Sequence, residues 1–291
     1  MHPTSHIQLK KTPGILGLYK RALFAKGSKK PNPTLPNTQI TLRDTLSDPK
    51  KITQYKEVCG FKEDNGNLPL TFPHIIAFPI HLELMLSKGF PFALLGMVHI
   101  RNEITQHRAI KSHEIMDICC SFSDLRTTDK GYEVDIKSEV YIAGDRVWES
   151  ISTNLIRRKT GVAAQPKATN QEAEDNTGLK TESWSLASNL GRRYALVSGD
   201  SNPIHLLKLS AKLFGFKGHI AHGMWTKARV AAALHNQLDS EACKITVDFK
   251  LPIFLPGKIQ LQYQNASNEI TFDVKDEQGI KPHLKGSIVK L

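Results

Sequence analysis

The chain has 291 residues, of which 40% are hydrophobic, so it can build one large core or two smaller ones. Its formal net charge is +11 and its isoelectric point is near 9.4, which indicates an anionic partner. The basic residues are scattered, without zinc-ligand spacing, an RNA-binding aromatic motif or a long basic block. This pattern argues against nucleic acid and favours a small anionic ligand or an acidic protein.

The cysteine pattern and the lack of targeting segments indicate where the protein works. The four cysteines show no C-x-x-C pair and are too few for a disulfide scaffold, so we expect free thiols in a reducing compartment. No apolar run near the N-terminus reaches the length of a signal-peptide core, and no later run is long enough to span a membrane. We therefore expect a cytoplasmic protein without stable membrane insertion.

In chain order, residues 1–37 come first and form a basic leader. Residues 15–24 are predicted to form a short amphipathic helix. Such a helix could touch a membrane surface, but we expect it to pack on its own protein.

The rest of the chain contains two divergent copies of one plan. The matched positions are Tyr55 with Tyr194, Gly60 with Gly199, residues 74–75 with 219–220, and residues 98–104 with 247–253. We therefore divide the chain into an N-terminal repeat (38–158), a polar linker (159–181) and a C-terminal repeat (182–291). The linker is predicted from its few large apolar residues and its many small or charged ones.

Each copy is predicted to contain a short helical entry, a longer apolar helix and then several strands, which is an α+β arrangement. In the second copy the long helix is expected over residues 219–238. Strands are expected over residues 99–105, 115–124, 131–143 and 147–157 in the first copy, and over 244–250, 258–264, 270–275 and 284–290 in the second.

Asp200 and His205 are the candidates for proton transfer. Gly199 favours a sharp turn before them, and Pro203 stiffens the segment between them. An Asp–His pair that holds one water can move the protons needed to add water to a conjugated thioester. The residues alone also fit an ordinary turn, in which Asp200 and Asn202 cap backbone amides.

The start of the predicted long helix supplies the second candidate feature. Its first amides, near Gly223, can stabilise a developing oxyanion, and glycine leaves room for a close approach. Thr226 could contact the substrate or simply pack. His219 and His222 lie three residues apart without a carboxylate ligand on the same face, so a metal site is not expected.

These residues belong to a longer motif. The string YALVSGDSNPIH (194–205), followed by Ala211, Gly215 and Phe216 and by IAHGM (220–224), closely resembles the motif of MaoC-like (R)-specific enoyl-CoA hydratases and 3-hydroxyacyl-thioester dehydratases. Residues 68–85 and 90–110 are similar to the N-terminal half of the double-hotdog dehydratases. The resemblance covers the chain from about residue 40 onward.

The resemblance implies a double hotdog fold, in which each repeat wraps a curved antiparallel sheet around a long helix. The resulting internal pseudo-dimer could be a monomer or pair as a homodimer. Asp200 and His205 would activate water, and Gly223, Asn202, Thr226 and His222 would bind the substrate or its oxyanion. No metal or redox cofactor is implied, because the chemistry is proton transfer. Coenzyme A or the phosphopantetheine of an acyl carrier protein enters as part of the substrate.

The function that this resemblance implies is a hydro-lyase of fatty acid metabolism that interconverts (3R)-3-hydroxyacyl and trans-2-enoyl thioesters. The alternatives are a hotdog thioesterase and a non-catalytic acyl-thioester binding protein. In the first repeat, Phe61 and Gly66 match Asp200 and His205, so we expect that copy to be catalytically degenerate. Its apolar run over residues 68–85 could line a tunnel for a sizeable acyl chain, although the phenylalanines there could equally be plain core.

Overall fold

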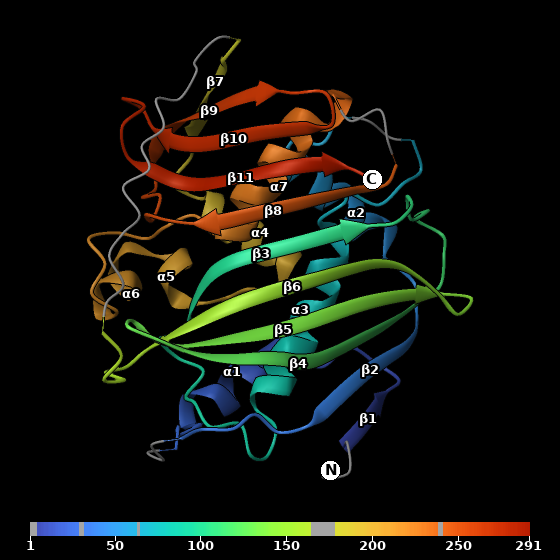
Figure 1. Ribbon diagram of the computed structural model, residues 1–291, viewed down its shortest axis with the longest axis vertical. Coiled ribbons are helices and arrows are strands. Elements are labelled where there is room, and N and C mark those ends of the chain that lie inside the picture. The colour runs from blue at the N-terminus through green and yellow to red at the C-terminus, as the bar shows by residue number, and fades with distance from the viewer. Residues whose placement is uncertain (1–4, 29–31, 63–64, 164–177, 238–240) are drawn as a thin grey trace.

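Eleven strands form one sheet, with the main helices behind it (Figure 1). The computed structural model describes the whole chain except residues 1–4, 29–31, 63–64, 164–177 and 238–240. The strands are β1 (Ser5–Leu9), β2 (Thr38–Thr45), β3 (Val98–Gln106), β4 (Met116–Thr128), β5 (Gly131–Ile142), β6 (Asp145–Arg157), β7 (Lys180–Leu186), β8 (Cys243–Phe249), β9 (Gly257–Asn265), β10 (Glu269–Asp276) and β11 (Pro282–Lys290). The helices are α1 (Ile15–Phe24), α2 (Pro49–Cys59), α3 (Phe72–Met85), α4 (Leu190–Ser198), α5 (Pro203–Leu206), α6 (Lys208–Leu213) and α7 (Gly223–Leu234), followed by a 3-10 turn at His235–Gln237.

The strand order is the same in both halves when it is read outward from the centre. The order is β1-β2-β4-β5-β6-β3-β8-β11-β10-β9-β7, so β3 and β8 meet in the middle, and β2 and β7 lie outermost among the strands of the two repeats. β3 and β8 pair antiparallel from Arg101 opposite Asp248 to Gln106 opposite Cys243. Every neighbouring pair is antiparallel except β1 and β2.

α2 and α4 end in the same way. Gly60 and Gly199 follow them with φ values of 82° and 77°, a left-handed conformation that glycine adopts without Cβ strain. The rings of Tyr55 and Tyr194 lie 6.1 Å apart, so the matched tyrosines meet where the two halves join.

Two other matches between the copies are wrong. His74 lies inside α3, whereas His219 and Ile220 precede α7, and Ile220 forms a β-bridge with Phe254. Val98 begins β3, whereas Val247 lies in the second half of β8. Alternating apolar residues recur every second position, so they cannot fix the register of a strand by themselves.

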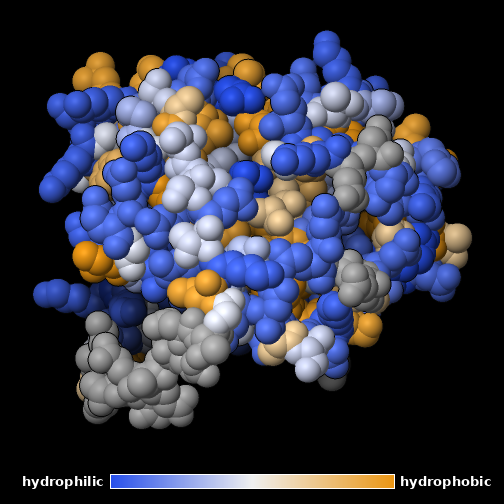
Figure 2. All heavy atoms as spheres, turned by 90° about the horizontal axis from the view of Figure 1, so that it is seen from above, coloured by the Kyte–Doolittle hydropathy of each residue, from blue (hydrophilic) through white to orange (hydrophobic). Residues whose placement is uncertain are grey.

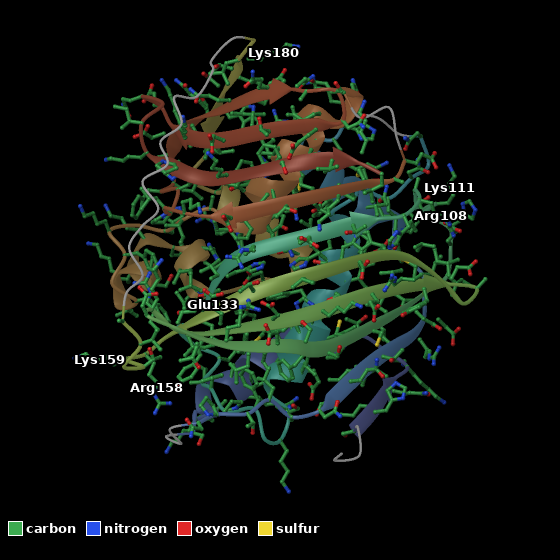
Figure 3. All side chains as sticks on the ribbon, viewed as in Figure 1. Arg108, Lys111, Glu133, Arg158, Lys159 and Lys180 are labelled. Atoms are coloured by element: carbon green, nitrogen blue, oxygen red, sulfur yellow. The ribbon has the colours of Figure 1, made fainter. Side chains whose placement is uncertain are left out.

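Several element boundaries also differ from the sequence-based expectation. The helix expected over residues 219–238 begins at Gly223, because the residues before it are extended. β1, β2 and β7 were not predicted, and residues 180–181 belong to β7 rather than to the linker. Most of the expected linker, residues 164–177, lies outside the described residues. Figure 3 places Lys180 at one end of the long axis and Lys159 in the other half of the molecule.

α1 packs on the protein, as expected. Leu18 and Ala22 are buried, with 2% and 1% exposure, and α1 contacts α3. Its outer side leaves Leu16 and Phe24 exposed. The face of the molecule in Figure 2 is mainly hydrophilic, with hydrophobic residues in scattered small groups. None of the helices in the described part of the chain has the length and hydrophobicity to cross a membrane.

The buried core is continuous between the halves. Apolar residues of α2, α3, α4 and α7 belong to one cluster with the inward-facing residues of the sheet. The indole Nε1 of Trp225 in α7 donates a hydrogen bond of 2.9 Å to the carbonyl of Val58 in α2. The two repeats are therefore packed as one unit.

Candidate active site

Asp200 follows α4 in a tight turn that fixes its carboxylate. Its amide donates to Ser198 Oγ (3.1 Å), and its Oδ1 accepts from the amide of Asn202 (3.2 Å). Asn202 in turn caps α5, because its Oδ1 accepts from the amide of Ile204 (3.3 Å). The turn contacts expected of Asp200 and Asn202 are therefore present, and both residues also line a cavity.

His205, in α5, is buried with 8% exposure. Its Nδ1 lies 2.8 Å from the carbonyl of Ile220. A carbonyl can only accept, so Nδ1 carries the proton and Nε2 is left as an acceptor. The backbone thereby sets the tautomer that a general base requires.

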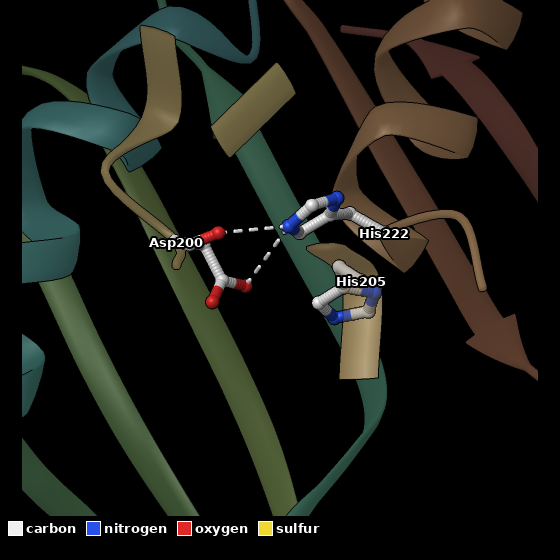
Figure 4. A group of neighbouring side chains, drawn as sticks. All are labelled: Asp200, His205 and His222. Carbon is white, nitrogen blue, oxygen red and sulfur yellow. Dashed lines mark hydrogen bonds and ion pairs between the residues drawn. The ribbon is translucent and has the colours of Figure 1, made fainter. Parts of the chain in front are cut away.

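His222 joins the loop that carries Asp200 to the start of α7. Its Nε2 donates to the carbonyl of Asp200 (2.9 Å) and lies 3.9 Å from Asp200 Oδ2, and its ring stacks on His205 with centroids 3.7 Å apart. Figure 4 shows the carboxylate of Asp200 facing these two rings. Because its Nε2 is already bonded, His222 holds the loop and the ring of His205.

The three side chains form a compact group. The carboxylate of Asp200 and a ring nitrogen from each histidine lie within 4.8 Å of one another. This spacing leaves room for one bridging water between Asp200 and His205. It is also a spacing that a metal ion could use, although one nitrogen of each imidazole is bonded to a backbone carbonyl. The absence of a metal therefore stays a prediction.

Tyr19 is a site residue that the sequence did not reveal. Its hydroxyl donates to Asp200 Oδ1 (2.9 Å), although the two residues are 181 positions apart. Ile15, one turn earlier in α1, covers Gly199, where an added Cβ would lie 3.1 Å from its side chain. No local pattern in the leader signals this contact, which depends on how α1 packs.

Gly223 and Thr226 lie in the first turn of α7. The amide of Gly223 is the first in the helix, and such amides have no partner within the helix. A Cβ on Gly223 would lie 2.8 Å from the ring of Phe249, so the glycine accommodates a core ring. Thr226 is buried, and its Oγ1 donates to the carbonyl of His222 (3.3 Å). Both residues line the cavity.

The cavity has a volume of about 360 Å³ and extends from the Asp200 loop to α3 and β6 of the first repeat. Asp200 keeps 28% side-chain exposure because it faces this space. Phe61, matched to Asp200, instead stacks on Tyr55 with ring centroids 6.4 Å apart and lines a separate cavity of about 400 Å³. Gly66, matched to His205, has no side chain that could transfer a proton.

The pKa values favour one protonation state. Burial lowers the pKa of His205 and, together with His205 itself, lowers the pKa of His222 to about 3. Burial alone would raise the pKa of Asp200, but His222, His205 and the hydrogen bonds of its carboxylate hold that pKa below the ordinary 3.8. At neutral pH the site therefore contains an ionised carboxylate and two neutral imidazoles.

The chain resembles known proteins in both sequence and fold. Residues 168–286 match the sequence family described as the MaoC like domain. The chain belongs to the MaoC-like dehydratase family. One relative is 3-hydroxyacyl-thioester dehydratase X of Mycobacterium tuberculosis, which is 31% identical over 254 residues, 87% of this chain and 90% of the relative.

Solved structures confirm the hotdog expectation. A crystal structure of HtdX from M. tuberculosis superposes with a TM-score of 0.75 and 28% identity, covering 87% of this chain and 100% of that chain. A MaoC-like dehydratase from Phytophthora capsici gives a TM-score of 0.70 at 16% identity, with 87% of this chain and 95% of that chain covered. The second likeness supports the fold alone.

Proposed function

We propose that this chain is a hydro-lyase that interconverts (3R)-3-hydroxyacyl and trans-2-enoyl thioesters. The observation that carries the proposal is the pairing of an ionised Asp200 with a neutral His205 across the space of one water, at the wall of a cavity. The relative's name describes the same chemistry in the direction of dehydration.

In the direction of hydration, Asp200 and Nε2 of His205 hold the water by accepting its two hydrogens. The water oxygen bonds to the β-carbon, and one of its protons passes to this pair. The electrons of the C=C bond move toward the thioester oxygen, and the pair then returns a proton to the α-carbon. The proton that the water loses equals the proton that the α-carbon gains, so the reaction requires no redox group or metal. We propose that none takes part.

The negative charge on the thioester oxygen needs a donor that is already in place. The amide of Gly223 lies at the positive end of α7 and lines the same cavity. Tyr19 and His222 are positioning residues, since both form hydrogen bonds to Asp200 and hold its loop.

The basic residues of the cavity indicate which group carries the acyl chain of the substrate. Arg157 and Lys250 line the cavity, and the chain carries a net charge of +11, so a phosphate-bearing phosphopantetheine is the expected partner. Coenzyme A and an acyl carrier protein both present this group. We propose that the first repeat is catalytically silent, because Phe61 and Gly66 offer no acid or base.

The test follows the enoyl-thioester absorbance of crotonyl-CoA and of a longer trans-2-enoyl-CoA. Wild type should consume the absorbance without releasing thiol, also after dialysis against EDTA. Asp200→Asn and His205→Ala should each lower kcat by roughly 100-fold or more. As a matched control, Phe61→Ala at the corresponding position of the first repeat should retain turnover.

Each contrary result points to a defined alternative. Release of free thiol would indicate a thioesterase. Tight binding of both thioesters without turnover, with carrier-linked substrates equally inert, would indicate a binding protein. Full activity in a folded Asp200→Asn variant would contradict the proposed mechanism.

A further inference from the structure

Three histidines lie in the first repeat, outside the Asp200 loop, two of them buried (His74 and His81) and one partly buried (His99). His74 and His81 belong to α3, and His99 belongs to β3. The ring of His74 lies 5.5 Å from that of His81 and 6.1 Å from that of His99, which it meets nearly parallel. We call these three residues the histidine cluster.

The histidine cluster faces the same cavity as Asp200. On α3, the cavity is lined by His74, Ile75, Phe78, His81, Leu82 and Met85, a stripe with helical spacing. Glu83, the other ionisable residue of α3, points away and pairs with Arg21. Both histidines of this apolar helix thus line the space where the acyl chain of the proposed substrate would lie.

Not all nitrogens of the histidine cluster are used within the protein. His81 Nε2 lies 2.6 Å from Ser138 Oγ. In contrast, His74 Nδ1 and His99 Nε2 are buried without a hydrogen-bond partner among the described residues. An unsatisfied buried polar group costs about 1–3 kcal/mol, so a pocket for a plain alkyl chain would be better built from apolar side chains.

The cluster is not arranged for a metal. Zinc bound by imidazoles needs nitrogens roughly 3.4 Å apart, given a Zn–N distance of about 2.1 Å. Within the described part of the chain, the group with closely spaced ligand atoms is Asp200, His205 and His222, not these three residues.

The cluster is also uncharged. Burial lowers the pKa of His81 to about 3 and that of His99 to about 4, and burial with the other two rings lowers the pKa of His74. The nearby Lys227 is already engaged, because its Nζ contacts Asn102 O, Asn102 Oδ1 and Ile245 O. Lys227, the cation that contributes to these lowered pKa values, is therefore not free to pair with a buried carboxylate, whereas a neutral hydroxyl or keto oxygen suits a neutral imidazole.

We infer that the cavity takes an acyl thioester whose chain carries a neutral hydrogen-bonding oxygen, which the histidine cluster binds. This inference rests on the proposed hydro-lyase function and adds the class of acyl chain. It also gives the first repeat a role in substrate selection.

The experiment compares kcat/KM for trans-2-decenoyl-CoA with that for the same chain carrying a hydroxyl at C5, C7 or C9, and with a form ending in a carboxylate. The kcat/KM of one hydroxylated chain should be about tenfold higher than that of the plain chain, a ratio equivalent to about 1.4 kcal/mol. His74→Phe keeps a ring but removes both nitrogens, and should bring this ratio close to one. Phe78→Leu, on the same stripe, is the matched control and should keep the ratio.

The inference is overturned if no hydroxylated chain has a higher kcat/KM than the plain one, or if the preference survives in His74→Phe, His81→Phe and His99→Phe alike. A preference for the carboxylate-ended chain would also overturn it. If wild type turns over none of the chains, the proposed function fails separately. Calorimetric binding of saturated decanoyl-CoA and its hydroxylated forms then tests the cluster alone, and equal affinities reject it.

Discussion

The carboxylate of Asp200 is oriented by two donors on the same oxygen, the amide of Asn202 and the hydroxyl of Tyr19. Burial and the charge of Asp200 raise the pKa of Tyr19 well above 10, so the phenol stays protonated and continues to donate. Both bonds favour the ionised carboxylate and leave its other oxygen directed toward His222 and the cavity.

Tyr19→Phe should therefore lower activity and change its pH dependence. The Tyr19 bond lowers the pKa of Asp200, so its loss should raise that pKa and move the acidic limb of the kcat/KM profile to higher pH. We expect kcat to fall about tenfold. The same bond stabilises the fold above the unfolded pKa of the carboxyl, and this stabilisation disappears as pH falls through the lower folded pKa.

A pH–rate profile of Tyr19→Phe beside Tyr141→Phe separates these effects. Tyr141 lies on β5 and does not line the cavity, so its variant should keep the wild-type profile. An unchanged acidic limb in Tyr19→Phe would show that α1 does not tune Asp200.

The local part of the site could be predicted from sequence, and the distant part could not. Asp200, Asn202, Pro203 and His205 fall within one turn and a short helix, where spacing fixes geometry. Tyr19 reaches Asp200 only after α1 has packed, and it lies far outside residues 168–286, which match the family model. The close contact of Gly223 with Phe249 is likewise set by how α7 packs on β8.

At the scale of elements, the start of α7 is packed tightly against β8. Gly223→Ala should lower the free energy of unfolding by about 1–3 kcal/mol, because the new methyl would lie 2.8 Å from the ring of Phe249. Urea titration measures this change. Adding Phe249→Leu should restore part of the loss, and failure to do so would place the strain elsewhere.

Two of the three strands absent from the prediction, β1 and β7, have a weak sequence pattern. β7 buries only Trp184 and Leu186, near its end, and β1 buries none of its five residues. Period-two alternation is therefore faint in both. The long strands β4 to β6 and the later strands β8 to β11 alternate clearly and were predicted to within a few residues. Boundaries were least certain where an extended segment runs into a helix, as it does before Gly223.

At the scale of the whole molecule, Lys227 in α7 connects the two halves. It is fully buried, and its ammonium group contacts Asn102 of β3 and Ile245 of β8, the two strands that join the repeats. Asn102 continues the network to Ser150 and Ser152 of β6.

Lys227→Met should lower the free energy of unfolding by roughly 2–5 kcal/mol, since it leaves several buried oxygens without their donor. Denaturation followed by tryptophan fluorescence reports on both halves, because Trp148 lies in the first and Trp184 and Trp225 lie in the second. Both should unfold in one transition. Lys258→Met, at a lysine with 61% exposure, is the control and should change stability by less than about 0.5 kcal/mol. A separate early transition of one half would contradict this coupling.

The mirrored strand order, with β3 against β8, has an evolutionary consequence. In a dimer of identical single-hotdog chains, every mutation appears at both sites, so a change that favours one cavity alters the other. Here each half is encoded separately, and either can drift without changing its counterpart. A chain that contains both repeats can therefore hold an acid and a base in one half and three histidines in the other. A symmetric pair of identical subunits cannot.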